Sequence, residues 1–401
     1  MPPKQRRYFY RKDKNFMKIL NGVHTSATIF TVGNPTHAID HYALEQLQQL
    51  CNNETLQDAR IRVMPDVHPG IVGTIGLTLT LTDKIMPNLL GIDIGCGMTL
   101  AKIKDKKVEF QKLDTVIRNN IPSGFAIRKK AHRFSENFPF EKLYCLEHIN
   151  LKKAQLSLGT LGGGNHFLEM DKDLDGQLYI VIHSGSRHLG KEVTEYYLNQ
   201  GQQVLKQQGI QIPYELTYLE GAWMEKYLHD IQIVQDYASL NREIILDELA
   251  KGMKWKITDQ YECIHNYVDD CEDVVNMFGA PLLRKGAISA KQGESVIIPI
   301  NMRDGILLGT GLGNEEWNFS APHGAGRILK REEVKNKFTV SAFKSEMKGI
   351  YTTCIGKDTL DEAPFAYRGL DDIAEAIHET VHIDQIIRPI YNFKAGENEK
   401  R

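Results

Sequence analysis

The sequence lacks any apolar run long enough to span a bilayer, and its polar N-terminus does not read as a secretory signal. It also lacks a C-x-x-C pair, although it contains six cysteines: Cys51, Cys96, Cys145, Cys263, Cys271 and Cys354. These absences exclude a disulfide framework and a zinc finger, and they make a reducing cytoplasm the expected location, with no membrane as partner. We expect most of the thiols to be inert core residues.

A strong net charge is missing as well. The formal net charge is −2, which argues against a protein that coats nucleic acid with a wholly basic surface. A local basic groove is compatible with this value, because phosphate contacts depend on where the charges lie. Two small basic clusters are present, and each alone is more typical of a solvated face or a loose terminus. They are Arg6, Arg7, Arg11 and Lys12, and Arg128, Lys129, Lys130 and Arg133.

Internal repeats, low-complexity segments and Pro/Ser-rich linkers are also absent from the sequence. With 42% hydrophobic and 25% charged residues, the chain has an ordinary globular composition. We therefore expect a single domain over residues 1–401, with a helical insertion at about 190–255. The class is α+β, with large central sheets flanked by helices. Apolar spacing predicts helices at 38–50, 191–208 and 223–249, and β-branched runs predict buried strands at Ile71–Leu81, Tyr179–His183 and Ser295–Ile300.

The candidate functional residues lie in the joints between these elements, that is, in the loops and at the strand ends. In the run 91–97, Asp93 and Cys96 stand three residues apart among glycines, which allow a tight bend that turns both side chains to one point. The same run also fits a plain strand-end turn with a buried cysteine. In 161–169, three glycines precede Asn165 and His166, as phosphate cradling or metal binding requires. A tight turn with a hydrogen-bonded core histidine is the commoner alternative.

Two further joints carry histidines. An apolar strand delivers His183 at its end, and a Ser-Gly-Ser-Arg loop containing Arg187 leads into a helix, which favours a phosphate site. His323 is followed by Gly324 in a loop that we expect to bury little. An exposed neutral imidazole there is a good nucleophile towards phosphorus, provided that a metal or an arginine screens the phosphate charge.

Each joint alone is ambiguous, but together they offer a mixed oxygen, sulfur and nitrogen donor set with His323 left over. A bridging thiolate with several imidazoles suits two borderline metals, and ligand type alone favours zinc. The set is Asp93, Cys96, His166, His183 and His265, the last of which lies in a polar stretch after Cys263.

In combination these residues resemble the RtcB-type RNA-splicing ligases. The resemblance runs in family order from about residue 20 to about 394. The motifs that carry it are Pro65–Gly70, Asp93–Gly97, Gly164–Phe167 with Glu169, His183–Arg187, Asn241-Arg242, His265-Asn266, Arg284–Ala287 and His323–Arg327.

The resemblance implies a fold with a deep metal-containing cleft and a ligation in three steps. His323 would take a guanylate from GTP, the guanylate would pass to an RNA 3′-phosphate (opened from a 2′,3′-cyclic end where necessary), and a 5′-hydroxyl end would then displace GMP. The resemblance also implies two Mn²⁺ ions in place of zinc, held by Asp93, Cys96, His166, His183 and His265.

By the same resemblance, the guanine nucleotide would contact a larger set of residues. This set is Asn165, His166, Phe167, Glu169, His265, Asn266, Pro299, Asn301, Met302, Gly324, Ala325, Gly326 and Lys394. Arg187 and His68 are the candidates for the RNA end, and an archease-type activator is an expected partner.

One segment departs from the family pattern. Where Pro-Gly-Ser-Met-Gly is usual, this chain reads Pro299-Ile300-Asn301-Met302-Arg303-Asp304-Gly305, which adds bulk and charge beside the expected nucleotide. The departure indicates a divergent bacterial-type branch that serves RNA repair or tRNA splicing. It leaves open whether the protein uses GTP or ATP. DNA as a substrate is also open.

Two other classes compete with the ligase. A metal-dependent phosphoesterase or nuclease would use the same metals to activate water but would have no use for His323. A non-catalytic RNA-binding protein would have no use for five metal ligands.

Overall fold

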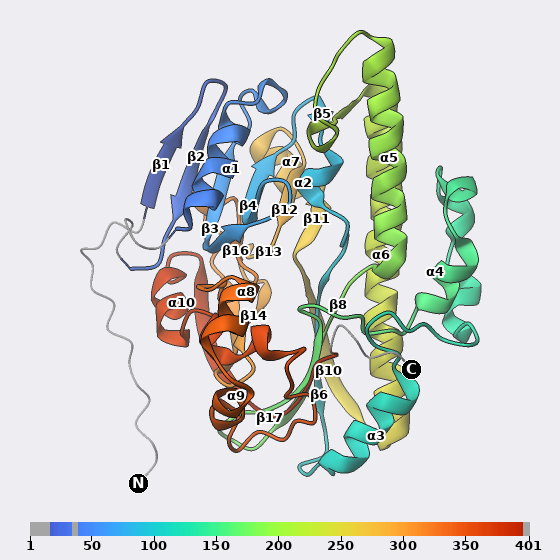
Figure 1. The fold of residues 1–401 in the computed structure, drawn as a ribbon, viewed down its shortest axis with the longest axis vertical. Helices are drawn as coiled ribbons and strands as arrows, with labels where there is room; N and C mark the ends of the chain where they lie inside the picture. The colour runs from blue at the N-terminus through green and yellow to red at the C-terminus, as the bar shows by residue number, and fades with distance from the viewer. Residues whose placement is uncertain (1–16, 34–38, 396–401) are drawn as a thin grey trace.

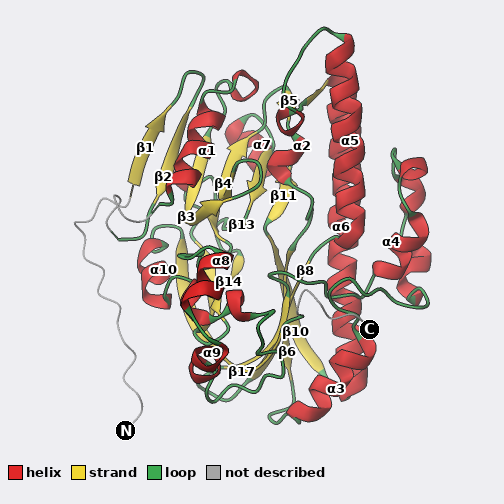
Figure 2. Ribbon diagram, in the orientation of Figure 1, coloured by secondary structure: helices red, strands yellow, loops and turns green. Residues whose placement is uncertain are grey.

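The computed structural model describes residues 17–33 and 39–395, and the basic cluster Arg6–Lys12 lies outside these residues. The chain is α+β, as expected from the sequence, with two large sheets and helices packed against them (Figures 1 and 2). Of the helices in the described residues, none combines the length and the apolar character that crossing a membrane requires.

The larger sheet has seven strands, and all its neighbouring strands are antiparallel. In spatial order they are β10 (Ile257–Ile264), β6 (Gly97–Ile103), β8 (Leu178–Ser184), β7 (Phe167–Lys172), β17 (Val381–Phe393), β15 (Gly305–Gly311) and β14 (Ser295–Asn301).

The second sheet has six strands, with one parallel pair, β2 and β3. Its order is β1 (Met17–Asn21), β2 (Ser26–Phe30), β3 (Ile61–Pro69), β4 (Thr74–Thr80), β12 (Leu282–Lys285) and β11 (Asn266–Asp269). Two-stranded sheets join β13 (Ala287–Ser289) to β16 (Ser320–Pro322) and β5 (Lys84–Ile85) to β9 (Leu219–Glu220).

The two longest helices are α5 and α6, which lie side by side in Figure 1 and fill most of the segment expected to be helical. α6 packs on β8 through Ile245 and Leu249, which join a buried cluster with Ile180 and Ile182. The α-helices are α1 (His41–Cys51), α2 (Pro87–Leu90), α3 (Phe110–Asn120), α4 (Leu151–Ser157), α5 (Arg187–Gln207), α6 (Gly221–Met253), α7 (Glu272–Phe278), α8 (Arg331–Lys337), α9 (Val340–Glu346) and α10 (Leu370–Ala376).

Two sequence predictions are wrong at their boundaries. The strand expected from Ile71 begins only at Thr74, because Gly73 turns with φ +64° and leaves Ile71 92% exposed. The helix expected from residue 191 begins at Arg187, so it starts directly after the His183 strand and shortens the loop between them. The single domain over residues 1–401 stays a prediction.

Candidate active site

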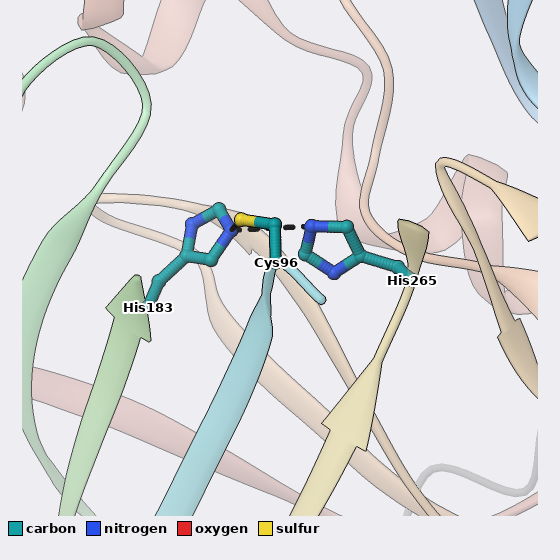
Figure 3. A group of neighbouring side chains, drawn as sticks. All are labelled: Cys96, His183 and His265. Carbon is teal, nitrogen blue, oxygen red and sulfur yellow. Dashed lines mark hydrogen bonds between the residues drawn. The ribbon is translucent and has the colours of Figure 1, made fainter. Parts of the chain in front are cut away.

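Three neighbouring strands bring a cysteine and two histidines to one edge of the seven-stranded sheet. Met98 of β6 is paired with Cys263 of β10 on one side and with His183 of β8 on the other. Side chains two residues apart on a strand point to the same face. Cys96 therefore points to the same face as Met98, and His265 points to the same face as Cys263. Figure 3 shows the result, with Cys96 between the imidazoles of His183 and His265.

Two loop residues complete the donor cluster. His166 immediately precedes β7, and its Nε2 lies 3.1 Å from Asp93 Oδ2 and 3.4 Å from Cys96 Sγ. A Cβ on Gly185 would lie 2.1 Å from Asp93 Oδ1, so the carboxylate can lie there only because residue 185 is glycine. The structure thus brings together all five expected donors. They form two groups that share Cys96, namely Asp93, Cys96 and His166, and Cys96, His183 and His265.

The hydrogen-bond pattern of the cluster fits a cation. Nδ1 of His166 lies 3.0 Å from the carbonyl oxygen of Leu161, and Nδ1 of His183 lies 3.1 Å from that of Asn165. A carbonyl only accepts, so both Nδ1 atoms carry the proton and both Nε2 atoms present lone pairs. Both Nε2 atoms lie 3.4 Å from Cys96 Sγ, and its single thiol proton can satisfy only one of them.

The electrostatics differ between the members of the cluster. Burial and the neighbouring Asp93 raise the pKa of the Cys96 thiol well above its usual range, so a bound cation would have to displace its proton. Burial, together with the neighbouring His166 and His323, lowers the pKa of His183 well below its usual range. Burial alone would raise the pKa of Asp93, but a protonated His166 beside it outweighs burial and holds that pKa below its usual range. Next to a neutral His166, a bound cation would supply that positive charge instead. Neutral imidazoles and an ionised carboxylate are the forms that bind metal ions.

His323 lies beside this cluster and is held by a buried carboxylate. Its ring centroid is 4.8 Å from that of His265, and its Nδ1 lies 2.7 Å from Oδ2 of Asp66, which is fully buried. The expectation of an exposed histidine in a loop that buries little is wrong. The His323 side chain is only 15% exposed and Gly324–Gly326 are buried, because the loop packs under β3 and a Cβ on Gly326 would lie 2.4 Å from the Asp66 carbonyl oxygen.

A cavity of about 330 Å³ opens in front of His323 and His183. This volume is in the range of small-molecule sites. Most residues expected to contact a nucleotide line it: Asn165, Phe167, Glu169, Pro299, Asn301, Met302, Gly324, Ala325, Gly326 and Lys394. His68 also lines the cavity, and its ring stacks at 6.5 Å from that of His323.

An ion-pair network forms another part of the cavity wall. Lys394 Nζ lies 2.8 Å from Glu362, and Arg331 Nη1 lies 2.5 Å from the other oxygen of the same carboxylate. Burial would raise the pKa of Glu362, but Lys394, Arg331 and Arg327 outweigh it and keep the group ionised. Arg331 also pairs with the buried carboxylate of Asp361, so three cations face two carboxylates and the wall keeps a small positive excess, which suits a polyphosphate.

Three residues expected at the nucleotide do not line the cavity, namely His166 and His265, which belong to the donor cluster, and Asn266; Arg187, which was expected at the RNA end, does not line it either. Asn266 does not line the cavity, since its Oδ1 accepts from the Gly286 amide at 2.8 Å and its Nδ2 donates to the Asp93 carbonyl at 3.3 Å. Arg187 lies behind His166, with 3.4 Å between its Nη1 and the His166 Nδ1. The backbone of Arg187 has φ +55°, which non-glycine residues rarely adopt, so the contacts around the start of α5 must stabilise this conformation.

Buried Arg242 of α6 holds the donor-bearing loops together. Its Nη1 donates to the carbonyls of Gly95, at 2.8 Å, and Ser184, at 2.7 Å, and its Nε donates to Glu262 at 2.9 Å. It therefore connects the residue before Cys96 to the residue after His183.

We expect Arg242→Ala to destabilise the protein by about 3–5 kcal/mol, because two carbonyls and a partly buried carboxylate lose their partner. Chemical unfolding measures the change. Arg133→Ala, at a side chain that is 64% exposed, is the control and should stay within about 0.5 kcal/mol. Equal effects for the two variants would contradict the structural role of Arg242.

The fold and the site together define a protein with a cysteine-, histidine- and aspartate-rich donor cluster beside a nucleotide-sized cavity. A family model described as tRNA-splicing ligase RtcB matches residues 46–144 and 140–395. The chain belongs to the RtcB family.

Individual relatives are similar in sequence to this chain over most of their length. The chain is 30% identical to RNA-splicing ligase RtcB1 of Escherichia coli strain ATCC 25922, over 93% of this chain and 98% of that protein. It is 29% identical, with the same coverage of each, to RNA-splicing ligase RtcB of Escherichia coli strain K12. Identity to tRNA-splicing ligase RtcB of Archaeoglobus fulgidus is 28%, over 84% of this chain and 87% of that protein.

Proposed function

We propose that this protein is an RNA ligase that joins 2′,3′-cyclic phosphate or 3′-phosphate ends to 5′-hydroxyl ends, with GTP and two Mn²⁺ ions. The single observation that carries the proposal is His323, which is held by Asp66 between the donor cluster and the cavity. The full-length similarity to proteins named RNA-splicing ligases supports RNA as the substrate.

His323 is the proposed nucleophile. Asp66 keeps the proton on Nδ1, so Nε2 retains its lone pair. Nε2 attacks the α-phosphorus of GTP, which forms an N–P bond and breaks the P–O bond to the leaving pyrophosphate. Where the end is a 2′,3′-cyclic phosphate, water first attacks its phosphorus and breaks the bond to the 2′-oxygen, which leaves a 3′-phosphate and a 2′-hydroxyl. An oxygen of the RNA 3′-phosphate then attacks the phosphorus of the guanylate, which breaks the N–P bond and releases His323. Finally, the 5′-hydroxyl oxygen of the second strand attacks the 3′-phosphate and GMP leaves.

Asp93, Cys96, His166, His183 and His265 are the residues that would hold the two metal ions. When bound, the ions supply charge neutralisation to phosphate oxygens. Ligand type favours zinc in affinity, so the use of Mn²⁺ would reflect metal availability and activity. Arg187, beside His166, and His68, in the cavity wall, are the proposed contacts of the RNA end.

The cavity residues named above, together with His166, His265 and Asn266, form the proposed nucleotide site. Glu169 is its proposed guanine-reading group. The carboxyl group is 3% exposed, and Asn392 donates to its Oε2 at 2.6 Å. Guanine offers N–H donors to a carboxylate, and adenine lacks the amino group that guanine carries at C2.

Glu169→Gln should therefore reduce the preference for GTP over ATP by roughly 10- to 100-fold, the value of a bidentate contact of about 1–3 kcal/mol. Burial raises the pKa of Glu169, so the protonated fraction grows as pH falls, and GTP affinity of the wild type should fall with it. In the variant this dependence should disappear. Calorimetric titration with both nucleotides over a pH series measures these effects, and an unchanged preference would exclude Glu169 as the specificity residue.

The reaction itself is tested with matched RNA pairs. We expect joining of 3′-phosphate to 5′-hydroxyl ends, and none of 3′-hydroxyl to 5′-phosphate ends, in the presence of Mn²⁺ and GTP. A DNA pair with the same ends tests the choice of nucleic acid. Cleavage of RNA without joining would support the metal-dependent phosphoesterase instead.

The proposal includes RNA repair or tRNA splicing in the cytoplasm as the setting, and an archease-type protein as activator. Faster multiple turnover on addition of such a protein would support the second point.

A further inference from the structure

A second, basic groove lies next to the donor cluster. It has a volume of about 740 Å³ and is lined by the end of α3, the loop after it and Glu248 of α6. Its lining is made up of residues 118–123, 126–130 and 248, and it shares no residue with the lining of the nucleotide cavity.

Backbone hydrogen bonds attach this groove to the loop that carries His166. The Gly124 amide donates to the Gly162 carbonyl at 2.9 Å, and the Leu161 amide donates to the Pro122 carbonyl at 2.9 Å. The Leu161 carbonyl in turn lies 3.0 Å from His166 Nδ1. The wall of the groove is thus separated from a proposed metal ligand by a single residue.

Arg187 makes a second connection. Its Nη2 donates to the Gly124 carbonyl at 3.3 Å, while its Nη1 lies 3.4 Å from His166 Nδ1. Arg187 therefore links the loop that forms the groove to the donor cluster.

The groove is positively charged although the whole chain is not. Four cations line it against the single carboxylate of Glu248. Glu248 forms an ion pair with Arg128 at 2.7 Å, and Arg118 forms one with Asp114 at 2.8 Å. Lys129 and Lys130 are exposed, and among residues 17–33 and 39–395 neither forms an ion pair with a carboxylate. Two ammonium groups are thus available to an anionic ligand.

An aromatic ring stands in the same loop. Phe125 is 92% exposed, directly after Gly124, which has φ +63° and turns the chain outward. Within the described residues it packs against no other ring. Phe125 thus lies in the same loop as Lys129 and Lys130, outside the lining of the groove itself. An exposed ring near cations that pair with no described carboxylate is the combination that binds single-stranded nucleic acid, with stacking for a base and charge for the backbone.

We infer that this groove binds single-stranded RNA next to the end that is to be joined. Phe125 stacks on a base, and Lys129 and Lys130 each contact a backbone phosphate. The identity of the strand as RNA rests on the proposed ligase function, whereas the binding mode rests on the groove alone.

The test is fluorescence anisotropy of a labelled single-stranded RNA with a 3′-phosphate, titrated with the full chain over a salt series. Lys129→Ala/Lys130→Ala should weaken binding and make the slope of log affinity against log salt shallower by about 1.4, the value for two phosphate contacts on a single strand. Phe125→Ala should weaken binding about 10-fold with the slope unchanged, and Phe125→Trp should retain binding.

Two matched controls accompany these variants. Lys106→Ala/Lys107→Ala removes the same charge from an exposed lysine pair before the opposite end of α3, and Leu174→Ala removes another exposed apolar side chain, which is 89% exposed. Neither should change the affinity for RNA. Wild-type affinity in both groove variants, or an equal loss in the lysine control, would overturn the inference.

Failure of the groove and failure of the ligase proposal are separable. Labelling of His323 by GTP needs no RNA, so the groove variants should label like the wild type. If wild-type protein neither labels nor joins RNA, yet its RNA affinity depends on Phe125 and the lysines, the groove stands and the ligase proposal falls.

Discussion

Asp66→Asn should slow guanylylation of His323 by about 10³- to 10⁴-fold, the effect seen when the carboxylate of a histidine–aspartate pair becomes an amide. The asparagine amide would donate to Nδ1 if the side chain keeps its position, and this would move the imidazole proton to Nε2. The nucleophilic lone pair would then be lost while the shape of the site is kept. Rapid-quench measurement of adduct formation from labelled GTP gives the rate.

The control for this variant is its metal content, because Asp66 belongs to neither donor group. Asp66→Asn should bind Mn²⁺ like the wild type. A variant with normal metal content that forms the adduct within tenfold of the wild-type rate would show that the carboxylate does not set the tautomer.

Cys96→Ser should have the second large effect, a loss of Mn²⁺ affinity at both sites. Cys96 is shared by the two donor groups, and a serine hydroxyl does not ionise at neutral pH. Loss of a partner that only orients a ligand weakens metal binding 10- to 100-fold, so loss of a shared ligand should exceed about 100-fold. Metal content after dialysis, measured by mass spectrometry, checks this.

Cys263→Ser is the matched control. Cys263 is also buried and lies on the same strand face as His265, but its thiol donates to the Ser295 carbonyl at 3.3 Å and belongs to neither donor group. It should keep both ions. If the two serine variants bound metal equally well, Cys96 would not be a shared ligand.

The residues that the structure brings together in the donor cluster could be singled out from the sequence because strand ends are local signals. His183 ends an apolar run and Cys96 sits in a glycine-rich bend, so both could be recognised without knowing which strands pair. The pairing of β10, β6 and β8, which places the donors on one face, depends on contacts between distant segments and was not readable from the sequence.

The same limit explains what was missed. Asp66 belongs to the Pro65–Gly70 motif, but its role could not be predicted, since its partner His323 lies 257 residues further on. Glu362, the centre of the ion-pair network at the cavity, carried no local signal at all. Asn266 was expected at the nucleotide from the family resemblance, and the sequence did not indicate that its amide also connects two loops.

The most direct test of the central claim is incubation of wild-type protein and His323→Ala with Mn²⁺ and α-labelled GTP, with ATP in parallel, followed by denaturing electrophoresis. The account predicts an acid-labile adduct with GTP in the wild type and none in the variant. An adduct formed with ATP alone would keep His323 as nucleophile and replace GTP as the cofactor. Absence of an adduct with either nucleotide, from protein loaded with metal, would contradict the ligase mechanism.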